Sequence, residues 1–156
     1  VFVRELTRDD ARLWPDPTND VHVRRPAEDE AGSYSLLVAK SFFEDAEMPP
    51  EFLSIFTSCF YAAGAFFYMS EIDGVSAGGG MMSIHEGVAS LGGTGTLPEF
   101  RNRGVQKALL LARLAQAAES GCDLAMVATM PGSGSQRNVE RQSFRVVYTR
   151  TKFMKR

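Results

Sequence analysis

One stretch in the second half of the chain limits the possible folds more than any other. Residues 96–110 combine a proline, three basic residues and a glycine with closing leucines, which predicts a strand end, a tight turn and a long helix. The first N–H groups of a helix have no partner within it, and the peptide dipoles place partial positive charge there. Arg101, Arg103 and Lys107 add full charges, and Gly104 has no side chain to keep a ligand from the backbone. The stretch therefore predicts a phosphate site. The alternative is an ordinary basic helix start, with Pro98 ending the strand before it.

The hydrophobic pattern predicts helices and strands on both sides of this turn. Alternating or continuous apolar runs predict strands, and apolar residues three and four apart predict helices. Asp73-Gly74 is a strong hairpin signal, so three consecutive antiparallel strands are expected before the turn. The strand, helix and strand around the turn form a crossover unit, whose strands are parallel. The expected strands are residues 1–3, 21–25, 65–72, 75–84, 88–97, 124–129 and 144–153, and the expected helices are 27–43, 50–60, 105–120 and 136–142.

Glycines interrupt the two strands that precede the turn. They occupy positions 78–80 in one strand and 92, 93 and 95 in the next. Glycine inside a strand weakens it and often marks a bulge or a close approach of another group to the backbone. Loose packing at a sheet edge is the alternative explanation, and the sequence leaves both open.

Composition bounds the class of protein. A chain of 156 residues that is 44% hydrophobic and 23% charged can form one domain with a substantial core. No apolar run approaches the roughly 20 residues that a membrane helix needs, so no membrane partner is expected. Two cysteines, Cys59 and Cys122, indicate a reduced, cytoplasmic protein without a metal site. The net charge of −2 gives no reason to expect nucleic acid binding.

The first twenty residues are expected to lie outside the main domain. Two prolines within residues 15–20 interrupt any regular structure. We interpret residues 1–20 as an N-terminal extension, or as the end of an upstream segment followed by a linker, and residues 21–156 as the domain. A processed or trimmed N-terminus is the alternative.

The turn also carries a family resemblance. The spacing Arg101-x-x-Gly104-x-Gln106 resembles the acyl-CoA loop of the GNAT acetyltransferase superfamily, whose usual form is Gln/Arg-x-x-Gly-x-Gly/Ala. The order of elements from His22 to Phe153 is similar to that of the superfamily. Thr-Leu-Pro before the loop and Gln-Arg-Asn-x-Glu-Arg before the last strand are similar to bacterial members. The resemblance implies an α+β or α/β GNAT-like fold, with a mixed central sheet flanked by helices. It also implies direct transfer of an acetyl group from acetyl-CoA, without a metal, to a primary amine on a small molecule or a peptide.

The resemblance implies a set of CoA-binding residues. In the family, the strand before the loop is bulged and hydrogen-bonds the pantetheine arm, and a backbone N–H of that strand, which corresponds to a position near Leu97, commonly polarises the thioester. Gln106 departs from the family pattern, so the backbone there either lies farther from the pyrophosphate, or the Gln106 amide itself donates to it. The implied CoA-binding residues are Gly95, Thr96, Leu97, Arg101, Asn102, Arg103, Gly104, Val105, Gln106 and Lys107.

The second family signature is only partly present. Members commonly carry a tyrosine on the helix before the last strand, and that tyrosine often protonates the leaving CoA thiolate. Counting back from Phe144, Val139 stands at the tyrosine position and Ser143 at the usual glycine. This chain therefore uses another donor, releases the thiolate unassisted, or is not an active enzyme. Ser133 is the proposed acid, with Ser135 beside it, and ordinary loop chemistry is the alternative for both.

Acidic residues suggest a catalytic base and the charge of the acceptor substrate. Glu86, in the turn before the fourth of the expected domain strands, is the preferred base over the adjacent His85, because burial raises the pKa of a carboxylate toward neutrality. Simple capping of an exposed hairpin explains Glu86 equally well. Glu44, Asp45 and Glu47 fall between the first two helices, in a segment that helps form the acceptor site in the family, and favour a cationic amine.

Two other functions compete with an acetyltransferase. The missing tyrosine and the N-terminal linker also fit a non-catalytic CoA-binding or interaction domain. A nucleotide-phosphate binder is the third possibility, but the chain has neither a Gly-x-x-x-x-Gly-Lys-Ser/Thr loop nor a Gly-x-Gly-x-x-Gly turn. A homodimer is suggested by analogy alone.

Overall fold

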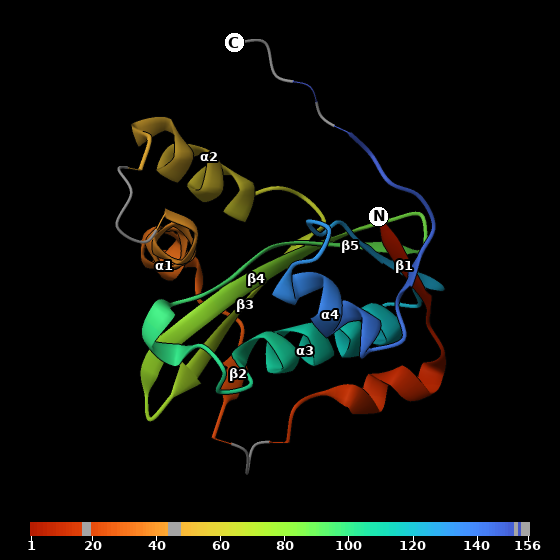
Figure 1. The fold of residues 1–156 in the computed structure, drawn as a ribbon. Helices are drawn as coiled ribbons and strands as arrows, with labels where there is room; N and C mark the ends of the chain where they lie inside the picture. Colours follow the sequence, from red (N-terminus) through yellow and green to blue (C-terminus); the bar gives the residue numbers. More distant parts are fainter. Residues whose placement is uncertain (17–19, 44–47, 152, 154–156) are drawn as a thin grey trace.

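The computed structural model describes residues 1–16, 20–43, 48–151 and 153. A seven-stranded mixed sheet forms its centre, in the order β2-β3-β4-β5-β6-β1-β7. Figure 1 shows α1 and α2 on one face of this sheet, and α3 and α4 on the other. The strands are β1 (Phe2–Glu5), β2 (His22–Arg24), β3 (Ala65–Ile72), β4 (Val75–His85), β5 (Val88–Thr96), β6 (Leu124–Val127) and β7 (Arg145–Val146). The helices are α1 (Ala31–Phe43), α2 (Pro50–Phe60), α3 (Val105–Glu119) and α4 (Gly134–Glu140).

The central strands follow the predicted connections. β3, β4 and β5 pair as an antiparallel meander, and the turn between β3 and β4 has positive φ at both Asp73 and Gly74. β5 then continues through the basic loop and α3 to β6, which pairs with β5 in parallel. The expected mixed sheet flanked by helices is therefore confirmed, and the basic loop lies at the end of β5 where α3 begins.

Two hydrophobic clusters hold the helices against the sheet. α3 contributes Leu109, Ala112 and Leu114, each fully buried, to the larger cluster. α1 contributes Tyr34 and Val38 to the smaller one on the opposite face. Glycines of β4 admit these helices closely, because a Cβ at Gly79 would lie 2.8 Å from a methyl group of Val38.

The N-terminal strand lies inside the sheet. β1 pairs antiparallel with both β6 and β7, and its Phe2 is 5% exposed in the larger core cluster. A 3₁₀ helix at Arg8–Leu13 follows and packs against α3. The described residues before position 20 thus share a core with the rest of the sheet. The division of the chain at residue 20 stays a prediction.

The last strand is shorter than expected. β7 covers two residues, and the strand ladder stops there although residues 144–153 alternate in the sequence. Two further backbone bonds extend the pairing, from Val147 N to Val1 O (3.0 Å) and from Val1 N to Tyr148 O (2.7 Å). Beyond Tyr148, the described residues 149–151 form no strand pairing.

Other parts of the predicted organisation have no structural outcome. The acidic residues Glu44, Asp45 and Glu47 lie outside the described residues, as does the middle of the proposed linker at 17–19. Of the helices that the structure describes, none combines the length and the apolarity required to cross a membrane.

Candidate functional site

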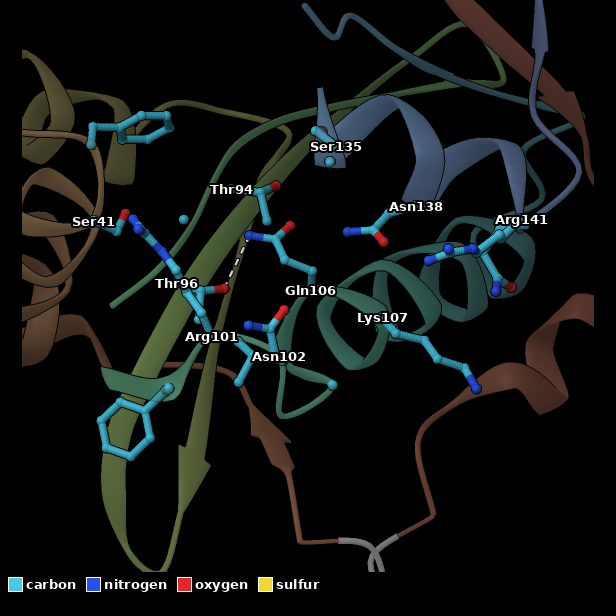
Figure 2. Close-up of a pocket in the computed structure, with 17 residues that line it drawn as sticks. Ser41, Thr94, Thr96, Arg101, Asn102, Gln106, Lys107, Ser135, Asn138 and Arg141 are labelled. Atoms are coloured by element: carbon cyan, nitrogen blue, oxygen red, sulfur yellow. Dashed lines mark hydrogen bonds between the residues drawn. The ribbon is translucent and has the colours of Figure 1, made fainter. Parts of the chain in front are cut away.

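A cleft of about 620 Å³ lies where β5, α3 and α4 meet, with the end of α1 on its far wall. Its size is in the range of small-molecule and cofactor sites. Figure 2 shows Thr94, Thr96, Gln106 and Asn138 around the same hollow, supplied by three different elements. The lining residues are Ser41, Phe42, Thr94, Gly95, Thr96, Phe100, Arg101, Asn102, Gly104, Val105, Gln106, Lys107, Gly134, Ser135, Asn138, Arg141 and Gln142.

The start of α3 presents its first backbone N–H groups at this cleft. Asn102 and Gly104 have left-handed backbone conformations, with φ of 63° and 85°, and Gly104 is the N-cap. The N–H of Ala108 donates to Gly104 O at 3.0 Å and so closes the first turn. The N–H groups of residues 105–107 precede that bond, and Gly104 has no side chain to cap them. Together with the helix dipole, they form a cup suited to an anion.

The charges around the cleft have one sign. Arg101, Lys107 and Arg141 line it, and the described lining contains no aspartate or glutamate. The positive residues come from the loop, from α3 and from α4, so the tertiary structure concentrates charge that the chain as a whole, at −2, does not have. A ligand with more than one phosphate fits this distribution.

The β5 wall of the cleft contains the expected bulge. Gly79 pairs with Gly95 and Met81 with Gly92, so a single residue of β4 faces two residues of β5. Gly93 takes a φ of 50° there, which glycine adopts without strain. The parallel pairing of β5 with β6 ends at Leu91 and Val127. Beyond that pair, β5 continues along the cleft, where an extended ligand can use its backbone groups.

A close contact between α1 and β5 forms the opposite corner. A Cβ built on Gly95 would lie 1.6 Å from Ser41 Oγ and 2.6 Å from Ser41 Cβ. Within α1, the Ser41 hydroxyl donates to Val38 O at 2.6 Å, which fixes the side chain that faces the strand. Gly95 is therefore required by the distance between helix and sheet.

Gln106 bonds within the protein. Its Nε2 donates to Thr96 Oγ1 at 3.0 Å, which links the first turn of α3 to the last residue of β5. This contact, drawn in Figure 2, places the side chain in the cleft where the family usually has glycine or alanine.

The structure brings most of the sequence-predicted CoA residues together in the lining of the cleft and leaves two, Leu97 and Arg103, outside that lining. Leu97 donates its N–H to Ala77 O at 2.9 Å and its side chain packs on the smaller core cluster. Arg103 turns away toward Asp73 at 3.7 Å, with its guanidinium 5.8 Å from the Phe100 ring. The N–H of Leu97 is thus engaged within the sheet. Those that line the cleft are Gly95, Thr96, Arg101, Asn102, Gly104, Val105, Gln106 and Lys107.

Neither proposed catalytic residue lines the cleft. Glu86 lies in the turn between β4 and β5 with its side chain 85% exposed, at the opposite end of β5 from Thr96. His85 beside it is equally exposed, with its Nε2 3.9 Å from the Glu86 carboxylate. Ser133 is the N-cap of α4, where its Oγ accepts from Gln136 N at 3.1 Å. Ser135, two residues on, does line the cleft.

Sequence reasoning missed the contribution of α4. Asn138 of α4 and Arg141, the C-cap of that helix, are three residues apart, so they lie on one side of it, and both line the cleft. They belong to the Gln-Arg-Asn-x-Glu-Arg motif, which was the available signal. Ser41 and Phe42 of α1 and Thr94 of β5 were also missed, and no local pattern distinguishes them.

One family description matches the chain. The profile of the acetyltransferase (GNAT) family matches residues 32–144, a range that contains β5, the basic loop, α3 and α4. No curated protein matches the sequence.

Solved structures share the architecture at low sequence identity. A transcriptional regulator from Bacillus halodurans C-125 is 16% identical, with a TM-score of 0.68 over 86% of this chain and 99% of that one. The aminoglycoside N-acetyltransferase AAC(6')-Iy, solved with CoA, is 22% identical, with a TM-score of 0.61 over 86% of this chain and 98% of that one. A GCN5-related N-acetyltransferase from Kribbella flavida is 22% identical, with a TM-score of 0.63 over 92% of this chain and 52% of that one. These likenesses show the shared GNAT-like fold.

Proposed function

The chain belongs to the GNAT acetyltransferase family, and from this premise we propose that it transfers an acetyl group from acetyl-CoA to a primary amine. The cleft at the start of α3 is the main observation that supports this proposal. There a helix N-terminus with open N–H groups, three basic side chains and the free part of β5 come together. These are the groups that a carrier with phosphates at one end and an extended arm at the other requires.

Different lining residues would bind the phosphates and the extended arm of CoA. The N–H groups of residues 105–107, with Arg101, Lys107 and Arg141, would hold the phosphates. The backbone of β5 from Thr94 to Thr96 would pair with the amide-containing arm, as an added strand does. Gln106 would keep its bond to Thr96 or exchange it for a phosphate oxygen, since a carboxamide donates to either.

The proton-transfer residues stay proposals. Acetyl transfer needs a neutral amine, a polarised carbonyl and release of the sulfur as the C–N bond forms. The sequence predicts Glu86 as the base, and because its exposed turn lies away from the cleft, the Glu86→Gln variant tests that prediction. The sequence predicts Ser133 as the acid. Its hydroxyl accepts from Gln136 N and still has its own hydrogen to donate, but the residue does not line the cleft.

The acceptor is proposed only as a class. A primary amine on a small molecule or a peptide fits the family, and a fold similar to that of an aminoglycoside N-acetyltransferase supports a small molecule. The acidic segment at Glu44, Asp45 and Glu47 favours a cationic amine. A cytoplasmic location, a homodimer and the absence of nucleic acid and membrane partners also stay proposals.

Ligand-dependent stability and turnover test the proposal. We expect CoA and acetyl-CoA to raise the melting temperature at millimolar concentration, because a ligand that binds only the native state stabilises it. ATP and NAD serve as controls for phosphate binding alone, and a larger shift with either would favour a nucleotide site. Release of free thiol from acetyl-CoA with a panel of primary amines then tests the transfer. The absence of any shift with CoA would contradict the proposal.

A non-catalytic CoA-binding domain is the second candidate. The observation that favours it is Val139 at the position where the family commonly has tyrosine, since valine cannot donate a proton. Stabilisation by CoA without turnover on any amine would support this candidate over the enzyme.

A further inference from the structure

A buried guanidinium lies directly behind the β5 wall of the cleft. Arg113 of α3 is 3% exposed, and its Nη1 donates to Thr94 Oγ1 at 2.7 Å and to Met81 O at 3.2 Å. Its Nε donates to Leu109 O at 2.9 Å. All these acceptors are neutral, and within the described ranges no carboxylate lies at ion-pair distance from Arg113. Burying an unpaired charge is costly, so its retention calls for an explanation.

The position of Arg113 is tied to the bulge. Its Nη1 is also 3.5 Å from Gly92 O, and a Cβ on Gly80 would lie 3.2 Å from its Cζ. The guanidinium thus fills the space under the bulge and contacts both strands that form it. Burial lowers the pKa of Arg113 to about 10, which still leaves it charged at neutral pH. The buried phenols of Tyr34 and Tyr68 interact electrostatically with it, and desolvation raises the pKa of each.

Thr94 connects this charge to the cleft. Its hydroxyl accepts from Arg113 and donates to Gly92 O at 3.1 Å, and the residue lines the cleft. A hydroxyl whose lone pair is engaged by a cation becomes a stronger donor. The hydroxyl hydrogen can rotate from Gly92 O to a ligand atom, while the bond from Arg113 persists.

The direction of β5 places Thr94 at the thioester end of the ligand. Thr96 adjoins the anion cup through its bond to Gln106, and Thr94 lies two residues farther from the cup along the same wall, about 7 Å in an extended strand. A carrier whose phosphates occupy the cup and whose arm follows β5 therefore has its sulfur on the Thr94 side. Val139, at the family's tyrosine position, is buried in the larger core cluster and offers no donor to the cleft.

We propose that the Thr94 hydroxyl, polarised by Arg113, donates the hydrogen bond that stabilises the CoA sulfur as it leaves. Thr94 is then a catalytic residue and Arg113 is its positioning residue. This inference rests on the proposed acetyltransferase function, and it supplies the donor that the missing tyrosine would otherwise provide.

The step balances without an additional reactant. The amine lone pair attacks the thioester carbon, and the C–N bond forms while the carbonyl electrons move to oxygen. When the carbonyl reforms, the C–S bond breaks and its electron pair goes to sulfur, which accepts the hydrogen bond from Thr94. The proton that the amine nitrogen loses passes to solvent and is finally taken up by the thiolate. Thr94 keeps its proton throughout.

The test measures the thiol of bound CoA and does not depend on the acceptor. We expect the thiol pKa of CoA bound to the wild-type protein, followed by thiolate absorbance, to lie below that of CoA bound to the Thr94→Val variant by about one unit. The Thr94→Ser variant keeps the hydroxyl and should match the wild type. Spectra with desulfo-CoA subtract the signals of Cys59 and Cys122. The Arg103→Met variant removes a charge that faces Asp73 outside the cleft lining and should leave the thiol pKa unchanged.

Kinetics provides the second readout. In Thr94→Val we expect kcat to fall about 10²-fold, with CoA affinity unchanged, because a donor to the developing charge acts on the transition state. Arg113→Lys should lose less than Arg113→Met, provided that circular dichroism shows both variants folded. Equal thiol pKa values in the wild type and Thr94→Val would overturn the inference even if the enzyme is active. Bound CoA with a lowered thiol pKa but no turnover would instead reject the acetyltransferase function and retain the Thr94–sulfur contact.

Discussion

Single residues in this protein are constrained by what lies against them more than by their own conformational preferences. Gly95 is the clearest case, because Ser41 of α1 occupies the space where any side chain would begin. Gly92, three residues earlier on the same strand, has nothing within 4 Å of a built Cβ. The two glycines look alike in the sequence and differ only through the packing of α1.

This contrast gives a prediction about stability. Gly95→Ala should lower the free energy of unfolding by about 1–3 kcal/mol, because α1 has to move to admit the methyl group. The same shift disturbs the cleft wall, so CoA binding should weaken as well. Gly92→Ala is the matched control and should change stability by less than about 0.5 kcal/mol. Urea unfolding measures the free energy of unfolding of both variants. Equal stability of Gly95→Ala and Gly92→Ala would show that Ser41 does not pack closely against Gly95.

Glu86 gives a second prediction at this scale. Glu86 precedes Thr94 by eight positions, and the part of β5 from Val88 to Thr94 alone spans about 20 Å in an extended strand. A base contributes typically 10²–10⁴-fold, so a role in catalysis would make Glu86→Gln nearly inactive. From the geometry we expect kcat/KM in Glu86→Gln to stay within about twofold of the wild type across the pH range. A loss of 10²-fold would establish Glu86 as the base and require β4–β5 to be rearranged.

At the scale of elements, the crossover from β5 through α3 to β6 organises the site. The end of β5 supplies an extended wall, the first turn of α3 supplies open N–H groups, and α4 closes the cleft with Asn138 and Arg141. None of these elements forms the site alone. The helix dipole of α3 adds to the fixed charges, so the anion cup does not depend on any single side chain.

The basic residues around this unit can be separated by substitution. Lys107→Met and Arg141→Met should each weaken CoA binding about three- to fivefold at low salt, and less at high salt, because exposed charge pairs are screened. Arg103→Met is the matched control, since Arg103 faces Asp73 and should leave the affinity unchanged. Calorimetric titration at two ionic strengths measures these effects. Equal weakening of CoA binding by all three variants would mean that the ligand also contacts Arg103.

For the whole molecule, the N-terminal strand β1 joins the C-terminal strand β7 to the other strands of the sheet. β1 lies between β6 and β7, so it connects the C-terminal strand to the rest of the sheet. β1 and the Arg8–Leu13 helix pack on the same core as α3. Chain segments that are 140 residues apart are thereby held side by side, as Figure 1 shows at the N-terminus.

This arrangement predicts a large effect of one substitution. Phe2→Ala should lower the free energy of unfolding by about 3 kcal/mol, because it removes a buried ring and leaves a cavity. Its neighbour across the strand pair is Val146, which is 60% exposed, and Val146→Ala should cost less than about 0.5 kcal/mol. Thermal or urea unfolding compares the two. An unaffected Phe2→Ala protein would support a domain that begins after residue 20.

Local sequence patterns were sufficient to predict several elements of the fold and most of the CoA loop. The bounds of β3 and α2 and the Asp73-Gly74 turn follow it closely, and most of the predicted CoA-loop residues do line the cleft. These features succeed because apolar periodicity, turn residues and an uncapped helix start act within a few residues of one another.

Contacts between residues far apart in the chain could be seen only in the folded structure. It placed β1 in the sheet, turned Arg103 toward Asp73, separated Glu86 from the cleft, and set Arg113 of α3 against Thr94 of β5. In the sequence, Arg113 is one more polar residue in an apolar helix, and its partners on β4 and β5 are 19 to 32 residues away. The physical reason is that strand order and the partners of a buried charge depend on packing between segments far apart in the chain, which local patterns do not encode.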